Sequence, residues 1–124
     1  MIKLVQCVRK RPRLTTEEFR VAWEEYAGRL REAALELGAI RVTLSTTLET
    51  PLNDALAAAR GSARAYDGVA EIVWTNGKKI LADAALPATR ERIARLREFQ
   101  EQFVDAGRSA FFFVHEQDLL GERE

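Results

Sequence analysis

Apolar residues follow two different periods along the chain, and the period separates predicted strands from predicted helices. Four short segments are rich in β-branched and aromatic residues and alternate at least in part, which is typical of half-buried strands. Residues 39–48 show the alternation most clearly, with Ile40, Val42 and Leu44 set against polar neighbours. The predicted strands are residues 2–9, 39–48, 69–75 and 110–117.

The longest predicted helix begins at Thr15 or Thr16 and ends before Gly38. Thr15 followed by Glu18 forms a capping box, and Leu14 with Phe19 forms the matching hydrophobic staple. Gly38 is suited to a left-handed helix end. The apolar positions of this segment step by three and four and therefore lie on one stripe: Phe19, Ala22, Trp23, Tyr26, Leu30, Ala33, Ala34 and Leu37.

Three further helical segments are shorter or interrupted. Residues 53–60 are rich in alanine and stop at Gly61, within a long connection. Residues 78–86 form a short helical piece that Pro87 breaks, and residues 88–107 follow with apolar residues at helical spacing.

The element order β-α-β-β-α-β predicts an α+β, ferredoxin-like fold, with one four-stranded antiparallel sheet and two main helices on one face. The 124 residues form a single domain in this interpretation. The last two strands are apolar on both sides, whereas the helices cover only one face. We therefore expect the sheets of two copies to pack together as a homodimeric α/β barrel.

Composition narrows the classes of partner. Nineteen basic residues balance nineteen acidic ones, so the net charge is zero and gives no field for nucleic acid or an anionic membrane. The basic cluster at residues 9–13 is followed by acidic residues and is explained by a solvated turn. A single cysteine, Cys7, excludes an internal disulfide and suits a cytoplasmic location. Neither a signal peptide nor a membrane span is expected.

Four motifs resemble the EthD-like branch of the dimeric α/β-barrel superfamily: MIKLV at the start, RPRLTTEEFRVAWEEY, YDGVAEI and GRSAFFFVHE. By this resemblance the superfamily includes cofactor-free quinone-forming monooxygenases, polyketide cyclases, lactone isomerases and haem-handling proteins. Fold alone does not choose among them. The family pattern places a histidine four residues after the helix tryptophan, and Ala27 stands there. The matching residues that remain are Trp23, Tyr66, Asp67, Gly68, Glu71 and Glu116.

Trp23 and Tyr26 are the first candidates for a ligand site between the helices and the sheet. Two interpretations stay open: both rings belong to the core, or both line a cavity for a flat apolar ligand, with the small Ala27 leaving space. Trp74 is a further aromatic candidate on the third strand.

His115, Tyr66 and Asp67 are the polar candidates. His115 is the only histidine and the natural acid or base near neutral pH, but it also suits a dimer contact or strand end. Tyr66 and Asp67 form a turn before the third strand, and Tyr66 could also offer its phenol to a ligand.

Other groups favour structural roles. Glu71 shares a strand face with Val69 and Val73, so an ion pair with Lys3 or Arg9 is expected. Cys7 is expected to be a small buried hydrophobe. One histidine and one cysteine, without a carboxylate pair at ligand spacing, predict no metal site, and haem bound through His115 is a remote alternative.

Two functions remain. The first is a small enzyme, without metal or organic cofactor, that acts on a planar apolar or polyketide-like metabolite, with Tyr26, Tyr66 and His115 as proton handlers. Trp23, Ala27, Trp74 and Asp67 are its expected ligand-binding residues. The second is a non-catalytic protein that binds the same kind of metabolite in a degradative or biosynthetic pathway. A purely structural role without a cavity, and a lid formed by residues 49–66, are left open.

Overall fold

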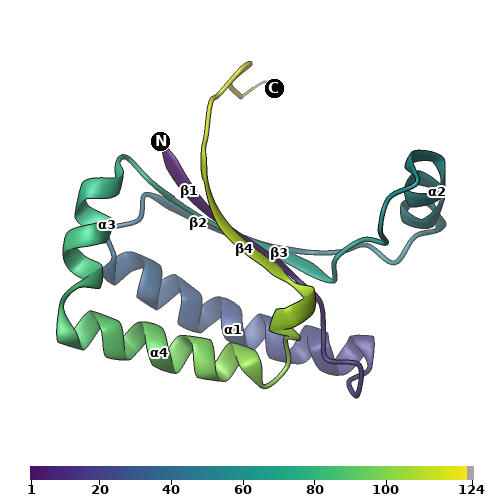
Figure 1. Ribbon diagram of the computed structural model, residues 1–124, viewed down its shortest axis with the longest axis horizontal. Coiled ribbons are helices and arrows are strands. Elements are labelled where there is room, and N and C mark those ends of the chain that lie inside the picture. The colour runs from purple at the N-terminus through teal and green to yellow at the C-terminus, as the bar shows by residue number, and fades with distance from the viewer. Residues whose placement is uncertain (123–124) are drawn as a thin grey trace.

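The computed structural model describes residues 1–122 and contains one antiparallel sheet with its two long helices on a single face (Figure 1). The strands lie in the order β2-β3-β1-β4. Their bounds are β1 (Ile2–Val8), β2 (Arg41–Thr46), β3 (Gly68–Trp74) and β4 (Ala110–His115). The helices are α1 (Thr16–Glu36), α2 (Pro51–Arg60), α3 (Gly77–Ala84) and α4 (Pro87–Glu101), and a 3₁₀ turn follows at Ala106–Arg108. The predicted ferredoxin-like arrangement is confirmed.

Helix α1 begins and ends at the residues that the sequence indicates. The backbone N–H of Glu18 donates to the Thr15 hydroxyl at 3.1 Å, and the Thr15 N–H donates to the Glu18 carboxylate at 2.9 Å. This capping box satisfies donors that a helix start leaves free. Gly38 follows the helix with a φ of +73°, which side chains with a Cβ rarely adopt. The capping box and the left-handed glycine are both confirmed.

The core lies between α1 and the sheet. It is built from the apolar stripe of α1 and the helix-facing positions of β1 and β3, with Phe103 and Val104 from the segment after α4. Strand register places Leu4 opposite Ile72 and Phe113, so these positions share the helix-facing side. The order of the strands therefore brings β1 to the middle of the core.

Helix α4 ends earlier than the sequence pattern predicts. The expected helix continued to about residue 107, but α4 stops at Glu101 and the chain turns. The N–H of Arg11 donates to the carbonyl of Phe103 at 3.0 Å, and Lys10 pairs with Val104 in an isolated bridge. These contacts with the segment after β1 replace the next helical turn. The break at Pro87 is confirmed, since Pro87 is the first residue of α4.

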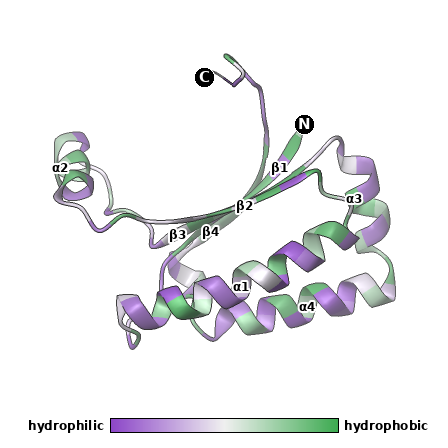
Figure 2. Cartoon of the chain, turned by 180° about the vertical axis from the view of Figure 1, so that it is seen from behind, coloured by the Kyte–Doolittle hydropathy of each residue, from purple (hydrophilic) through white to green (hydrophobic). Residues whose placement is uncertain are grey.

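Helix α2 lies away from the rest of the molecule, as Figures 1 and 2 both show. It starts at Pro51 behind the N-cap Thr50 and ends at Arg60, and the C-cap Gly61 has a left-handed φ of +62°. None of its residues is buried, and its leucines Leu52 and Leu56 are exposed. The connection between β2 and β3 is therefore a projecting arm that packs on neither α1 nor α4.

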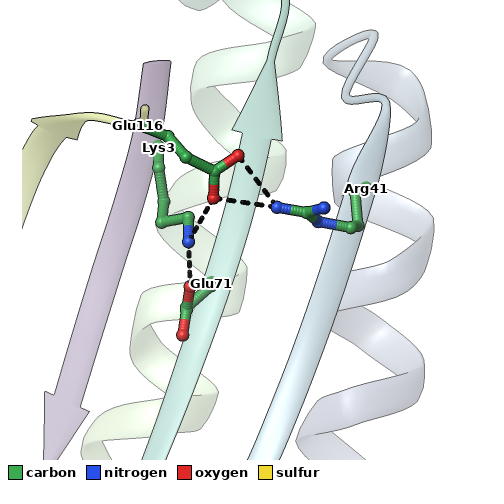
Figure 3. Close-up of polar contacts among 4 residues, drawn as sticks. All are labelled: Lys3, Arg41, Glu71 and Glu116. Carbon is green, nitrogen blue, oxygen red and sulfur yellow. Dashed lines mark hydrogen bonds and ion pairs between the residues drawn. The ribbon is translucent and has the colours of Figure 1, made fainter. Parts of the chain in front are cut away.

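Four charged side chains gather on the face of the sheet that the helices leave open (Figure 3). Lys3 of β1 lies between the carboxylates of Glu71 and Glu116, at 2.6 Å from Glu116, and Arg41 donates to Glu116 at 2.9 Å. Of the two partners expected for Glu71, Lys3 and Arg9, Lys3 is the one that pairs with it. The open face is mixed in character rather than apolar, because this cluster lies among apolar residues: Val5, Cys7, Val69, Val73, Phe112 and Val114.

The Glu116 carboxylate makes stability depend on pH. Its hydrogen bond with Lys3, aided by Arg41, holds the pKa of Glu116 below the ordinary value. A lowered pKa contributes stability above the ordinary glutamate pKa of about 4.3, and that stability is lost as the pH falls through the folded-state value. We expect the urea midpoint of the native chain to fall further between pH 6 and pH 3 than that of Glu116→Gln. Glu24→Gln, on an exposed position of α1, is the control, and parallel curves for all three would contradict the assignment.

Candidate functional site

An open cavity of about 340 Å³ lies where α1, α4 and the sheet meet. Its apolar walls come from three places. Ile93 and Leu96 belong to α4, Val104 and Ala106 to the segment that follows it, and Phe111 to β4. Its polar groups are Gln6 of β1, Tyr26 of α1 and Gln100, Arg97 and Glu101 of α4. Ligand pockets typically hold about 300 to 1,000 Å³ and have mostly apolar walls with a few polar groups. The cavity therefore has the size and lining of a small-molecule site.

The cavity exists because α4 leaves part of the helix-facing side of β4 uncovered. Phe111 and Phe113 lie on this side, opposite Gln6 and Leu4 of β1. Phe111 is nevertheless 42% exposed and Phe113 58% exposed. A strand whose helix-facing aromatic rings are only partly covered leaves apolar surface available to a ligand.

Three polar side chains form the floor of the cavity. The Tyr26 hydroxyl donates to the Gln6 Oε1 at 2.9 Å, and the Gln100 Nε2 donates to the same oxygen at 2.9 Å. Burial raises the pKa of Tyr26 to about 12, against a smaller opposing effect of the Gln6 hydrogen bond. At neutral pH the phenol therefore stays protonated and acts as a hydrogen-bond donor, not as a base.

Trp23 is part of the core and does not line this cavity. Its indole is 0% exposed and stacks between Phe19 and Tyr26, with ring centroids at 5.6 and 5.4 Å. The indole N–H donates to the carbonyl of Ser45 at 3.2 Å. Trp23 therefore fits the interpretation as a core residue. Tyr26 packs in the core and also borders the cavity.

Trp74 and Ala27, two more expected ligand-binding residues, also lie outside the cavity lining. Trp74 is buried at the other end of the sheet, where its indole N–H donates to the carbonyl of Leu37 at 3.0 Å. Ala27 is half-buried on α1 next to Tyr26. The small side chain at the family's histidine position does not widen the cavity, because it is not one of the lining residues.

Tyr66 and Asp67 border a different hollow, of about 420 Å³, between the start of α1 and the segments on either side of α2. The guanidinium of Arg9 lies 4.2 Å from the centre of the Tyr66 ring and donates to the carbonyls of Arg64 and Ala65. Asp67 accepts a hydrogen bond from the Lys10 N–H at 2.8 Å. These contacts fix the chain before β3, as expected for a structural turn.

His115 is exposed at the far end of β4. It pairs with Ile2 of β1, whereas Gln6 pairs with Phe111, four residues earlier on β4. At about 3.3 Å per residue this separates His115 from the cavity floor by roughly 13 Å along the strand. Within one chain, Tyr26, Tyr66 and His115 therefore lie at three different places and do not converge on one ligand.

Cys7 lies on the open face of the sheet and is paired with Val69 and Ala110. Burial raises the pKa of its thiol, which is the opposite of an activated nucleophile. Within residues 1–122, no cluster of three or more His, Cys, Asp or Glu side chains is placed to hold a metal ion.

Gln6 and Gln100 are the site residues that the sequence analysis missed. A signal was present for each of them. Gln6 interrupts the inward series Ile2, Leu4 and Val8 on β1, and Gln100 stands at an inward position of α4, where its side chain is buried. Polar side chains at positions that face a core need hydrogen-bond partners, so they point to a network or a site.

Taken together, the fold and the cavity define a ferredoxin-like α+β protein with a small-molecule-sized space between its helices and sheet. The match to the EthD domain covers residues 11–107, which is most of the chain. The chain belongs to the EthD family, as the sequence motifs indicated. The comparison with curated proteins found no match.

Solved structures share the fold at low sequence identity. A dimeric protein of unknown function and ferredoxin-like fold from Bacteroides fragilis is 8% identical, with a TM-score of 0.63 over 93% of this chain and 95% of that one. An EthD family protein from Bacillus halodurans is 12% identical, with a TM-score of 0.62 over 94% and 99%. SnoaB, a cofactor-independent oxygenase from Streptomyces nogalater, is 17% identical in its N63A form, with a TM-score of 0.56 over 98% and 97%. In residues 1–122, no helix has the length and apolar character to cross a membrane.

Proposed function

We propose that this protein is a small cofactor-independent enzyme of the EthD type that acts on a planar, largely apolar or polyketide-like metabolite. The reaction class is a proton shift, a cyclisation or an oxidation in a degradative or biosynthetic pathway. The observation that carries the proposal is the cavity of about 340 Å³, which has apolar walls and one polar end. Such a site accepts a flat ring and fixes its orientation through a few polar groups.

Tyr26 is the residue of the predicted catalytic set that the proposal places in the cavity. Its hydroxyl donates to Gln6, so donation of a proton to the bound ring requires the phenol to exchange that hydrogen bond for one to the ligand. Tyr66 and His115 take no part in this site, because one borders another hollow and the other lies at the end of β4. The oxygenase SnoaB has the same fold and is described as cofactor-independent, which supports the reaction class by likeness alone.

A homodimer is part of the proposal. One face of the sheet has no helix over it, and valines and Phe112 on that face surround the Lys3 ion cluster. The related fold from Bacteroides fragilis is described as dimeric. A second copy packed on the open face would cover these apolar side chains while leaving the cavity on the helix side accessible.

A second candidate function is metabolite binding without catalysis. The specific observation in its favour is the chemistry of the cavity, since no histidine, cysteine or serine is among the described residues that line it. Ala27 at the family's histidine position agrees with this alternative. The two functions share the ligand and differ in whether the ligand is changed.

The test compares ligand binding with ligand turnover on one protein sample. Light scattering on the same sample measures its molar mass and so tests whether it is a dimer. Planar aromatic ketones and phenols are screened for binding by calorimetry and for conversion by mass spectrometry. For an enzyme, Tyr26→Phe should lower turnover about a hundredfold or more while binding changes little. Tyr66→Phe is the matched control and should leave both unchanged. Binding without conversion favours the non-catalytic function, and an absence of binding in the cavity would overturn both.

A further inference from the structure

Gln6 and Gln100 meet on the floor of the cavity with one polar atom each left without a partner. Both residues are more than nine-tenths buried, Gln6 at 9% and Gln100 at 6% exposure. The Gln6 Oε1 accepts from Tyr26 and from Gln100, so both of its acceptor positions are occupied. Neither the Gln6 Nε2 nor the Gln100 Oε1 has a hydrogen-bond partner among the described residues.

These two atoms are not sealed off from solvent, and they belong to residues that both line the cavity. Within residues 1–122, no fully buried side-chain nitrogen or oxygen lacks a partner. The unpaired amide nitrogen of Gln6 and the unpaired amide oxygen of Gln100 are therefore accessible, and both residues line the same space. One is a donor and the other is an acceptor.

Turning both amides over does not change this pattern. In the reversed arrangement the Gln6 nitrogen would donate to the Tyr26 oxygen and to the Gln100 oxygen, leaving the Gln6 oxygen and the Gln100 nitrogen free. The two amides again offer one acceptor and one donor, but the Tyr26 proton then loses its acceptor, which favours the first arrangement. A complementary ligand group must therefore carry a donor beside an acceptor, whichever way the amides are turned.

The floor carries no net charge. Arg97 and Glu101 border the cavity as a mutually neutralising pair at 3.8 Å, and both side chains are at least half exposed to water. Because an unpaired charge is costly to bury, the group that meets the two glutamines is uncharged.

We infer that Gln6 and Gln100 recognise an uncharged edge of the ligand that carries one hydrogen-bond donor next to one acceptor, as in a lactam or a hydroxyl beside a carbonyl. The inference rests on the proposed function for the location of the ligand and adds the chemistry of its polar end. While the Tyr26 hydroxyl donates to Gln6, it also holds the Gln6 amide in place. The apolar walls, Leu96 and Phe111 among them, contact the rest of the ring system.

Three bicyclic probes of nearly equal shape test this inference on the full-length protein. 2-Quinolone carries an N–H beside a carbonyl, coumarin replaces the N–H with an oxygen, and naphthalene has neither. We expect 2-quinolone to bind about tenfold more tightly than the other two, because a buried polar group without a partner weakens binding. Binding is followed by calorimetry and located by chemical-shift changes at Phe111.

The variant Gln100→Met keeps a side chain of similar length without an amide, and should bring the three affinities to within about twofold. Gln102→Met, at an exposed position directly after α4, should leave the tenfold preference intact. Equal binding of all three probes to the native protein would overturn the inference and leave the proposed function standing. Binding of none of them at Phe111 would overturn both. If Gln100→Met does not fold, the affinities of the three probes for the native protein still test the inference.

Discussion

Trp23→Ala is expected to destabilise the protein by about 3 to 5 kcal/mol, since large aromatic side chains in a closed core cost that much when truncated. The indole has no exposed surface, and it contacts three aromatic rings: Phe19, Tyr26 and Phe103. A loss of this size is a large part of the about 5 to 15 kcal/mol that holds a typical domain folded. Urea unfolding followed by circular dichroism measures it.

Leu35→Ala on the same helix is the control. Leu35 is 61% exposed, and such surface changes usually stay within about 0.5 kcal/mol. If Trp23→Ala shifted the urea midpoint no more than Leu35→Ala, the indole would have to be loosely packed. It would then be a wall of an open cavity, which is the alternative that the sequence left open for this residue.

Local signals in the sequence were sufficient for the fold. Thr15 and Glu18 cap α1 through each other, and Gly38 and Gly61 end helices with left-handed backbones. These interactions span a few residues, so they can be read from neighbours in the chain. The same holds for the strands, whose predicted centres are confirmed and whose ends differ by one or two residues.

The end of α4 shows where local signals fail. Phe99 and Phe103 continue the helical spacing, and the pattern alone extends the helix past both. Yet the backbone of Phe103 and Val104 contacts Arg11 and Lys10, residues that are far away in sequence. A periodic pattern identifies which side chains turn inward, but it does not reveal that another segment competes for the backbone hydrogen bonds.

The candidate site depends even more on partners that are distant in sequence. Trp23 and Tyr26 stand three residues apart on one stripe and look equivalent along α1. The difference comes from what lies opposite: Gly68 of β3 allows the indole to lie directly on the sheet, whereas Gln6 of β1 receives the Tyr26 hydroxyl. Neither pairing follows from the spacing within the helix. The cavity forms next to Tyr26 because α4 does not fully cover Phe111.

Of the three predicted proton handlers, Tyr26 is the one that borders the cavity within one chain. Tyr26 keeps its proton at neutral pH as an ordinary tyrosine does, and burial raises its pKa further, to about 12, which disfavours the phenolate still more. A reaction at this site would therefore use the phenol as a donor and rely on the substrate's own acidity for any proton that is lost. The ligand inferred from the two glutamines has a donor next to an acceptor. Such a substrate can lose a proton from its donor while its acceptor receives one from the phenol.

Gly68→Ala is expected to destabilise the protein by about 1 to 3 kcal/mol, the usual cost of forcing extra volume into a packed core. An added Cβ would lie 2.7 Å from the Trp23 Cε2 and 2.8 Å from its Cζ2 and Nε1. The indole has little room to retreat, because it is stacked between Phe19 and Tyr26. Gly68 does not have a positive φ, so contact with the indole, and not backbone strain, is the reason for glycine here.

A double-mutant cycle isolates that contact. In a Trp23→Leu background, which keeps an apolar side chain but removes the indole, the cost of Gly68→Ala should nearly disappear, giving a coupling of about 1 kcal/mol or more. Gly28→Ala is the control, since an added Cβ there meets nothing within 4 Å and should raise helix stability by about 0.5 to 1 kcal/mol. If the losses from Trp23→Leu and Gly68→Ala simply added, the glycine would serve the strand backbone and not the indole. The close seating of Trp23 on β3, which separates it from the cavity, would then need another cause.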